Sequence, residues 1–368
     1  MAFSDFHGNA DLVRRLREML ARRRLPQGII LAGPEGSGKY TLALMLAKAV
    51  NCLTLPTSGD GLPDFCGQCS NCVRIGLSEN LTARVSEALE ARDAMRETEK
   101  KETRIFVQTH PDVLVIPPDP PQLMIKVDQV RRVVEHAYFR PAEAREKVYI
   151  FTSASFMKEA ANSLLKVLEE PPEFVTIVLL ANNPGELLPT IRSRAMTVTL
   201  GALPVSELET YLAAHRKNLD SRHRALVARL SEGAVGRARD FDVEGYLAAR
   251  QQALIILQSA LRGSDHSDLF KMTEAHRPGA EGREKTEALL RTLYSLLQDM
   301  LFLNSGMPEL VQNTDIAPEL GRLAQAADFP WISTAAERLA EVERGMRRNL
   351  LRALSLDAMA LALEKPVG

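Results

Sequence analysis

A glycine-rich segment near the N-terminus places the strongest constraint on the fold of this chain. Residues 33–40 read GPEGSGKY, between a short apolar run, Gly28 to Ala32 (GIILA), and an apolar helical pattern, Leu42 to Val50. Strand, glycine-rich loop and helix in that order begin an α/β unit in which backbone N–H groups can face phosphate groups. The sequence therefore predicts an α/β domain with a phosphate loop close to its N-terminus.

The loop matches the phosphate-loop pattern G-x-x-x-x-G-K-[ST] except at its last position. The matching residues are Gly33, Gly36, Gly38 and Lys39. The lysine of this pattern reaches the β- and γ-phosphates, and the hydroxyl that follows it holds Mg²⁺. Here Tyr40 stands in the hydroxyl position, and Thr41 comes one residue late, on another face of the helix. The pattern predicts the fold of a phosphate loop and leaves the binding of ATP or ADP open.

All cysteines of the chain fall in one short segment. They are Cys52, Cys66, Cys69 and Cys72. Four thiolates form a complete tetrahedral shell for Zn²⁺, which leaves no open position for a substrate. The cluster predicts a structural zinc site, and four unrelated buried thiols are the alternative. The N-terminus MAFSDFHGNADL shows no secretory signal, so we expect a cytoplasmic protein in which disulfides do not form.

Charge and hydropathy exclude some classes of function. The chain of 368 residues has 46 Lys and Arg against 47 Asp and Glu, so no global positive field could hold nucleic acid unaided. Six arginines between Arg14 and Arg24 could touch DNA phosphates, although a solvated helix face is the simpler interpretation. No apolar run approaches the roughly 20 residues that span a bilayer.

Strand and helix patterns alternate in the first 200 residues. We expect strands at 28–32, 112–116, 147–151, 174–181 and 196–200, and helices at 127–137 and 157–170. The nearly continuous apolar run 174–181 is typical of a central parallel strand. Residues 79–104 carry seven acids and six bases, which predicts a solvated helix or helical hairpin.

Beyond residue 203 the pattern is helical. Residues 203–241 predict a small bundle with Gly233 and Gly236 at a turn, and 245–363 predict helices with breaks at 263–265, 305–308 and 328–330. The expected fold is an α/β phosphate-loop domain with a parallel sheet, then a small helical lid domain and an all-α C-terminal domain. The expected domains are 1–202, with the cysteine module at 52–72 and a charged insertion at 77–105, then 203–243 and 244–368.

Four further stretches carry a family resemblance together with the cysteine module. They are LPQGIILAGPEGSGKYTLA (25–43), HPDVLVI (110–116), EKVYIFTSASFMKEAANSLLKVLEEPPE (146–173) and ANNPGELLPTIRSRA (181–195). Over about residues 3–240 the chain resembles the AAA+ subunits of the bacterial DNA polymerase III clamp loader, a family with a gamma/tau motor subunit and a delta-prime subunit. The resemblance implies an AAA+ module followed by a C-terminal collar domain that assembles with other subunits.

The departures from the motor pattern imply that this chain lacks intrinsic ATPase activity. In a motor relative, the strand matching KVYIF leads into acids that hold Mg²⁺, whereas residues 152–157 here contain no carboxylate. The family's sensing arginine falls on Gly236 in the stretch GAVGRA, with Arg237 next to it. Phosphoryl transfer depends on metal positioning and charge stabilisation, so losing these groups together should abolish most hydrolysis.

One element of the catalytic pattern is kept. Ser193-Arg194-Ala195 resembles the family's Ser-Arg-Cys motif, whose arginine enters the ATP site of the neighbouring subunit. An arginine supplied in trans can contribute about 10³–10⁵ in rate. Asn182 falls near the sensor-1 polar residue of the family, and a loop-capping role fits it equally well. The resemblance thus implies a delta-prime-type subunit that works with the motor and delta subunits, the sliding clamp and primer-template DNA.

Three other functions remain as alternatives at this point. An ATP-hydrolysing motor of the same family would need a hydroxyl after Lys39 and acids after Phe151, and both are absent. A phosphate-loop kinase for a small molecule would turn over ATP only with its substrate, and the long helical C-terminal third gives it no support. A zinc-dependent DNA-binding protein is disfavoured by the nearly neutral net charge.

Overall fold

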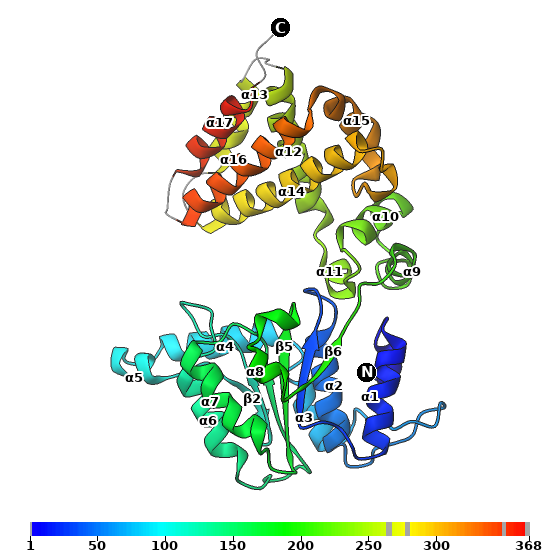
Figure 1. Ribbon diagram of the computed structural model, residues 1–368, viewed down its shortest axis with the longest axis vertical. Coiled ribbons are helices and arrows are strands. Elements are labelled where there is room, and N and C mark those ends of the chain that lie inside the picture. Colours follow the sequence, from blue (N-terminus) through cyan, green and yellow to red (C-terminus); the bar gives the residue numbers. More distant parts are fainter. Residues whose placement is uncertain (1, 263–266, 277–279, 348–350, 365–368) are drawn as a thin grey trace. The chain divides into compact units, whose positions relative to one another are not determined.

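The computed structural model describes residues 2–262, 267–276, 280–347 and 351–364. The chain divides into two compact units (Figure 1). The first unit comprises Met1–Pro204 and Gly233–Arg237, and the second comprises Val205–Glu232 and Ala238–Gly368. The finer division into domains at 1–202, 203–243 and 244–368 remains a prediction.

A six-stranded sheet forms the centre of the first unit. Its strands are β1 (Gly28–Ala32), β2 (Val107–His110), β3 (Val113–Ile116), β4 (Lys147–Phe151), β5 (Val175–Ala181) and β6 (Met196–Thr199). Their order is β2-β3-β4-β5-β1-β6, with parallel pairing everywhere except between β2 and β3. The predicted parallel α/β class and the central position of β5 are confirmed. The antiparallel strand β2 was not predicted.

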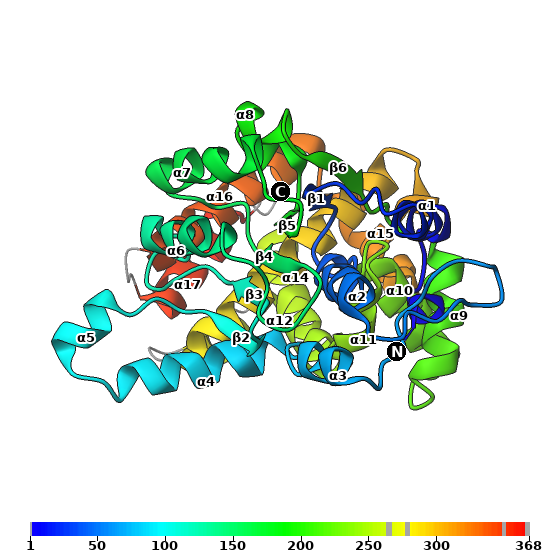
Figure 2. The same cartoon turned by 90° about the horizontal axis from the view of Figure 1, so that it is seen from below.

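Successive residues of each strand face opposite sides of the sheet, and both sides are covered. On β1, Ile29 and Leu31 pack in one core with α1, α2 and α3, whereas Ile30 and Ala32 pack in a second core with α6, α7 and α8. These helices are α1 (Ala10–Ala21), α2 (Lys39–Asn51), α3 (Ser70–Gly76), α6 (Val127–Ala137), α7 (Lys158–Glu169) and α8 (Pro189–Arg192). Burial on both faces explains why these central strands are buried along their whole length and mostly apolar (Figures 1 and 2).

The charged insertion forms the predicted helical hairpin. Its helices are α4 (Leu81–Asp93) and α5 (Glu97–Glu102), and neither buries a residue. Helix α4 lies beside β2 at the edge of the sheet, and α5 lies further out (Figure 2). Most of this segment is therefore solvated, as predicted, but the Arg92 side chain on α4 is only 14% exposed because it is paired with Asp119.

The arginine-rich N-terminal helix is only partly a solvated face. Arg14 and Arg15 of α1 are exposed, but the Arg17 side chain is buried. Arg17 Nη2 lies 3.0 Å from Asp60 Oδ1, and Arg17 Nε donates to the Pro63 carbonyl oxygen at 3.0 Å. The expectation of a solvated or phosphate-contacting face is wrong for Arg17, which holds the loop between Cys52 and Cys66 within the cysteine module.

The second unit is helical wherever the structure describes it, as predicted. Its helices are α9 (Val205–His215), α10 (Ser221–Leu230), α12 (Val243–Arg262), α13 (Ser267–Thr273), α14 (Ala280–Asn304), α15 (Ala317–Ala326), α16 (Phe329–Arg347) and α17 (Arg352–Ala362). Apolar residues of α12 to α17 form one core around Leu257, Leu293 and Leu339. In the part of the chain that the structure describes, no helix is both long and apolar enough to cross a membrane.

The structure confirms the predicted helix breaks only in part. The break at 305–308 separates α14 from a 3₁₀ turn, whereas α16 already begins at Phe329, so 328–330 is mostly helical. The break at 263–265 lies outside the described residues. Gly233 occupies a turn with φ of 80°, but Gly236 lies inside α11 (Val235–Asp240), so placing it at a turn was wrong.

Candidate functional site

The phosphate loop connects β1 to α2 and has the expected backbone form. Gly33 donates its N–H to the Ala181 carbonyl oxygen at 3.2 Å, and Gly38 is the N-cap of α2. Gly36 has φ of 78°, and a Cβ there would lie 2.8 Å from the backbone nitrogen of Arg237. Only glycine fits that position, because a left-handed backbone and a close neighbour coincide.

The cationic group of the loop is turned into the loop itself. Lys39 Nζ donates to the carbonyl oxygens of Gly33 and Pro34 at 2.5 and 2.8 Å, and to Asn182 Oδ1 at 3.1 Å. Burial lowers the pKa of Lys39, and the nearby carboxylates of Glu35 and Glu186 oppose that shift. Asn182, which follows β5, therefore lies beside the loop lysine.

The residue after Lys39 is directed away from the loop. The Tyr40 hydroxyl donates to the Ser78 carbonyl oxygen at 2.6 Å, and burial raises the pKa of this phenol. A hydroxyl held at Ser78 cannot also hold Mg²⁺ at the loop. Thr41 lies one residue further along α2. The geometry agrees with the sequence argument that the metal-holding hydroxyl is missing.

The end of β4 offers hydroxyls where hydrolysis needs carboxylates. The stretch after β4 contains Ser153 and Ser155, and the Ser155 N–H donates to Ser153 Oγ at 3.0 Å. The Ser155 carbonyl oxygen accepts the N–H of Ile125 at 2.8 Å, which ties the loop after β3 to this point. These contacts are structural, and no acid from 152–157 is available to a metal ion.

The start of α11 packs directly on the phosphate loop. The Gly236 N–H donates to the Gly36 carbonyl oxygen at 2.8 Å. A Cβ at position 236 would lie 2.9 Å from that oxygen, closer than side-chain carbons approach backbone. The position of the sensing arginine therefore has no room for a side chain in this arrangement.

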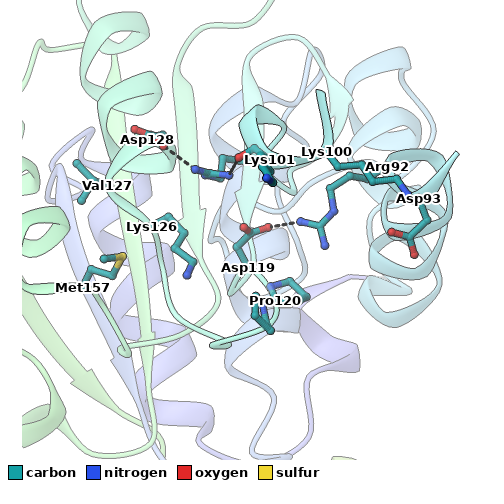
Figure 3. Close-up of a pocket in the computed structure, with 12 residues that line it drawn as sticks. Arg92, Asp93, Lys100, Lys101, Asp119, Pro120, Lys126, Val127, Asp128 and Met157 are labelled. Carbon is teal, nitrogen blue, oxygen red and sulfur yellow. Dashed lines mark hydrogen bonds and ion pairs between the residues drawn. The ribbon is translucent and has the colours of Figure 1, made fainter. Parts of the chain in front are cut away.

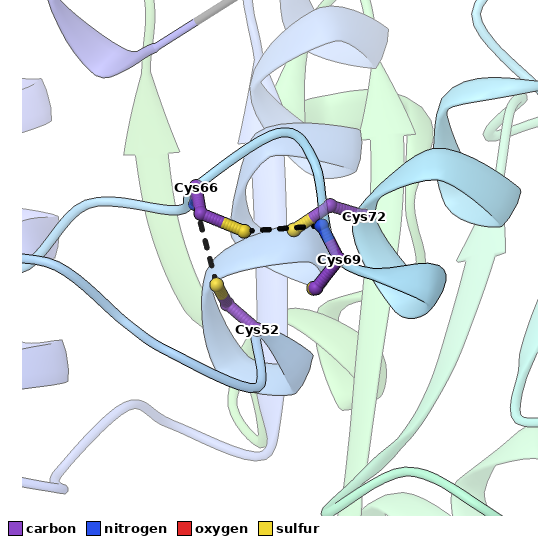
Figure 4. Close-up of side chains that lie close together, drawn as sticks. All are labelled: Cys52, Cys66, Cys69 and Cys72. Carbon is purple, nitrogen blue, oxygen red and sulfur yellow. Dashed lines mark hydrogen bonds between the residues drawn. The ribbon is translucent and has the colours of Figure 1, made fainter.

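The four cysteines meet in one place (Figure 4). The sulfur atoms of Cys52, Cys66, Cys69 and Cys72 all lie within 4.8 Å of one another. Tetrahedral Zn–S bonds of about 2.3 Å place sulfurs about 3.8 Å apart, so a small contraction would complete the shell. The Sγ atom of Cys52 accepts the N–H of Leu55 and of Cys66, each at 3.3 Å, and Cys66 Sγ accepts the N–H of Cys69 at the same distance.

The surroundings of these sulfurs favour thiolates at two positions. A hydrogen bond with the Thr54 hydroxyl, followed by backbone N–H groups, lowers the pKa of Cys66 to about 6. Burial by itself would raise the pKa of Cys52, but hydrogen bonds from Cys66, Thr54 and Leu55 outweigh it and lower the value. Burial raises the pKa of Cys72. A metal ion would supply the charge that this buried thiol lacks, so the donor set fits a divalent, thiol-binding metal.

Helix α2 joins the loop to the cysteine cluster. It begins at Lys39 and has Cys52 as its C-cap, so one rigid element carries both sites. Lys48 on α2 is buried and forms an ion pair with Glu79 at 2.6 Å, close to the Tyr40–Ser78 contact. Sequence patterns did not identify Lys48, Ser78 or Glu79, because their partners are distant in the chain.

Arg194 lies between α8 and β6 and remains accessible. Its Nη2 atom forms an ion pair with Glu169 Oε1 at 2.8 Å, and its side chain is 34% exposed. Nη1 donates to the Thr190 carbonyl oxygen at 2.9 Å and to Ser193 Oγ at 3.3 Å. These contacts hold the guanidinium at the surface of the first unit. Glu169, at the end of α7, is a partner that the sequence did not indicate.

These features define an α/β protein with a phosphate loop, in which Tyr40 follows the loop lysine, and with a four-cysteine module. A model of the family described as "DNA polymerase III, delta subunit" matches residues 8–204. The chain belongs to this family, as the sequence resemblance predicted.

Individual relatives agree with this assignment. A DNA polymerase III subunit tau/gamma of Haemophilus influenzae is 27% identical over 65% of this chain and 29% of its own length, so this chain spans less than a third of that relative. A DNA polymerase III subunit delta' of Bacillus subtilis is 24% identical over 92% of this chain and 91% of its own length. A subunit delta' of Yersinia pestis is 32% identical over 66% of this chain and 72% of its own length.

Proposed function

We propose that this chain is a delta-prime-type subunit of a bacterial clamp loader, without ATP hydrolysis of its own, that supplies Arg194 to the ATP site of a neighbouring subunit. The observation that carries the proposal is the contrast within the first unit. The hydroxyl of Tyr40 is bonded to Ser78, and no acid follows β4, whereas the Arg194 guanidinium stands at the surface. Such a chain can stabilise transition-state charge in another subunit's site but lacks the groups to position metal in its own.

The extent of the matches supports a delta-prime rather than a motor identity. The match to the Bacillus subtilis delta' subunit runs through nearly the whole of both chains, whereas the tau/gamma match covers under a third of the relative. A motor would also need a metal-holding hydroxyl after Lys39 and acids after Phe151. The missing groups weigh equally against a small-molecule kinase.

Zn²⁺ is the metal that we assign to Cys52, Cys66, Cys69 and Cys72. Four sulfur donors with no other ligand type form the usual shell of structural Zn²⁺, and all four are reduced here. Bound there, the ion would fix the loop 52–72 against α2. The role is structural, because a complete thiolate shell leaves no position for a substrate.

The assembly would contain the gamma/tau motor subunit, the delta subunit, the sliding clamp and primer-template DNA, in the cytoplasm. We assign the all-α C-terminal region to the collar that holds the subunits together. The loop at residues 33–40 needs no bound ATP or ADP for this role.

The test is ATP hydrolysis by motor and delta subunits with clamp and primed DNA, with this chain added as wild type, Arg194→Ala or Arg192→Ala. Arg192 is an exposed arginine of α8, two residues away, so its variant is the matched control. Size-exclusion chromatography of each mixture shows whether the variant still assembles.

We expect stimulation by the wild type and by Arg192→Ala, and loss of most of it with Arg194→Ala in a complex that still forms. Equal stimulation by both variants would contradict the proposed role of Arg194 in the neighbouring ATP site, but it would leave the proposed role in assembly. No stimulation by the wild type in a formed complex would contradict the proposed function.

A further inference from the structure

A cavity apart from the phosphate loop lies between the charged insertion and the loop that follows β3. Its volume is about 570 Å³, which is within the range of roughly 300–1,000 Å³ for small-molecule sites. Figure 3 shows Arg92, Lys100 and Lys101 of the insertion opposite Val127 and Met157, with Asp119 and Lys126 between them. The function proposed above uses none of these residues.

Two of the cations in this cavity are neutralised by acids of the same cavity. Arg92 Nη1 forms an ion pair with Asp119 Oδ1 at 3.0 Å, and both side chains are largely buried. Arg104 Nη2 forms an ion pair with Asp128 Oδ2 at 2.9 Å. These pairs fix the walls of the cavity, because each joins the insertion to the loop after β3 or to α6.

The remaining charge is positive. The cavity is lined by five basic side chains and three acidic ones, the third acid being Asp93. Lys100 is paired with Glu97, which lies outside the lining, at 3.1 Å. Within the described residues neither Lys101 nor Lys126 forms an ion pair, and the Lys126 ammonium donates to the neutral amide of Gln122. Lys126 is also the N-cap of α6, so the partial positive charge of that helix terminus adds to the field.

The shape and charge together indicate the class of ligand. Two lysines without an ion-pair partner in the described residues, Lys101 and Lys126, suit a phosphate monoester, which carries about −1.5 to −2 at pH 7, better than a single carboxylate or phosphodiester. The lining also has apolar residues. Val127 and Met157 lie opposite the basic side chains of the insertion, and Pro120 lies beside Asp119 with Pro121 next in the chain (Figure 3). A nucleotide has one such phosphate and one flat base, and its size suits the cavity.

We propose that this cavity binds the terminal phosphate and base of a nucleotide, presented either as a free mononucleotide or as the 5′-phosphorylated end of a nucleic-acid strand. Lys101 and Lys126 would contact the phosphate from two different segments. The insertion, which the family resemblance left without a role, would then form one wall of a ligand site. The proposal does not depend on the clamp-loader function.

The test measures binding of AMP and of a 5′-phosphorylated trinucleotide to the full chain by calorimetry, with adenosine and the unphosphorylated trinucleotide as matched probes. The variants are Lys101→Gln/Lys126→Gln and the control Lys217→Gln/Lys271→Gln, which removes the same charge from two exposed sites of the second unit. Lysine acetylation, read by peptide mass spectrometry with and without AMP, locates the ligand.

We expect the phosphorylated probes to bind about tenfold or more weakly to the cavity variant than to the wild type, because charge-assisted hydrogen bonds are among the strongest polar contacts. The control variant should change affinity less than twofold, and AMP should protect Lys101 and Lys126 from acetylation. Preference for AMP or for the trinucleotide identifies the source of the phosphate.

Several results would overturn the proposal. Equal weakening of phosphate binding in both double variants would show that the effect comes from the net charge of the protein and not from this cavity. Adenosine binding as tightly as AMP, or no binding of either phosphorylated probe at millimolar concentration, would remove the phosphate site. Protection of Lys39 in place of Lys101 and Lys126 would put the ligand in the phosphate loop. A phosphoserine peptide that binds more tightly than both nucleotide probes would contradict the nucleotide assignment.

Discussion

The two ends of α2 differ in how complete the set of side chains at each site is. At its N-terminal end the phosphate loop has its glycines, its lysine and its backbone form, but the side chains that would handle metal are absent or directed elsewhere. At its C-terminal end all four cysteines converge, with backbone N–H groups directed at two of the sulfurs. One helix thus connects a phosphate loop that we propose to be only a scaffold with a cluster in which four sulfur donors lie together.

The difference shows which parts of a site depend on backbone and which on side-chain ends. A phosphate loop can keep its form through glycines and packing, as Gly36 does against α11, whether or not hydrolysis occurs. A thiolate metal site cannot be maintained by its backbone in this way, because each of its ligands is a side-chain atom. We therefore expect substitutions at the cysteine end to have larger effects than substitutions at the loop end.

The largest effect should follow loss of one cysteine. Cys66→Ala leaves three sulfur ligands, so the zinc that we propose for this cluster should be lost together with its contribution to stability, which is about 10–16 kcal/mol in zinc-finger peptides. The measurements are zinc per chain by elemental mass spectrometry and the Tm. Gln68→Ala is the control, since this exposed residue donates only its backbone N–H to Cys66 Sγ. One zinc per chain in the Cys66→Ala variant would contradict the assignment.

A smaller loss is expected where α11 contacts the phosphate loop. Gly236→Ala places a Cβ 2.9 Å from the Gly36 carbonyl oxygen, and such overpacking costs about 1–3 kcal/mol. Amide hydrogen exchange of β1 and β5 measures the change in the first unit. Gly321→Ala is the control: nothing lies within 4 Å of that Cβ inside α15, so the helix should gain about 0.5–1 kcal/mol. Unchanged exchange in the Gly236 variant would show that the loop can move away.

The contact between the loop helix and the module should contribute less again. Tyr40→Phe removes the donor to the buried Ser78 carbonyl, which costs about 1–2 kcal/mol because the acceptor is left without its partner. Hydrogen exchange of α2 and α3 is the readout. Tyr138→Phe, at a tyrosine that is 54% exposed, is the matched control and should have no effect. A loss of the same size in both variants would assign the effect to something other than this hydrogen bond.

The smallest effect on stability is expected at the Arg194 surface. Glu169→Gln removes an ion pair whose side chains are 34% and 51% exposed, and pairs of this kind contribute about 0–1 kcal/mol. Thermal unfolding should be nearly unchanged, and stimulation of the motor's ATP hydrolysis should be retained, because the guanidinium is still present. Loss of stimulation with an unchanged Tm would instead make Glu169 a positioning residue for Arg194.

Local patterns predicted much of this molecule. The apolar runs of β1, β4 and β5 predicted these strands correctly, because both faces of the sheet are covered. The spacing of the cysteines predicted their cluster. The strand β2 was missed because its four residues, VQTH, lie at the sheet edge and show no apolar run. Arg17 was misassigned, since its partners Asp60 and Pro63 come from a loop more than 40 residues away.

The candidate site divides in the same way. The sequence alone shows that a residue type is missing from a motif, such as a metal-holding hydroxyl after Lys39, because this requires no knowledge of the structure. Three contacts depend on the packing of segments that are distant in the chain. They are the hydrogen bond of Tyr40 to Ser78, the ion pair of Lys48 with Glu79 and the ion pair of Arg194 with Glu169. No local period encodes such contacts, so the structure was needed to find them.

ATP hydrolysis by the purified chain alone tests the central claim most directly: the phosphate loop is a scaffold without hydrolytic chemistry. The assay compares the wild type with Lys39→Ala at saturating ATP and Mg²⁺, so that a contaminating ATPase gives the same rate in both. We predict equal background rates for the two proteins. Turnover by the wild type that Lys39→Ala abolishes would contradict the account and identify this chain as an active ATPase.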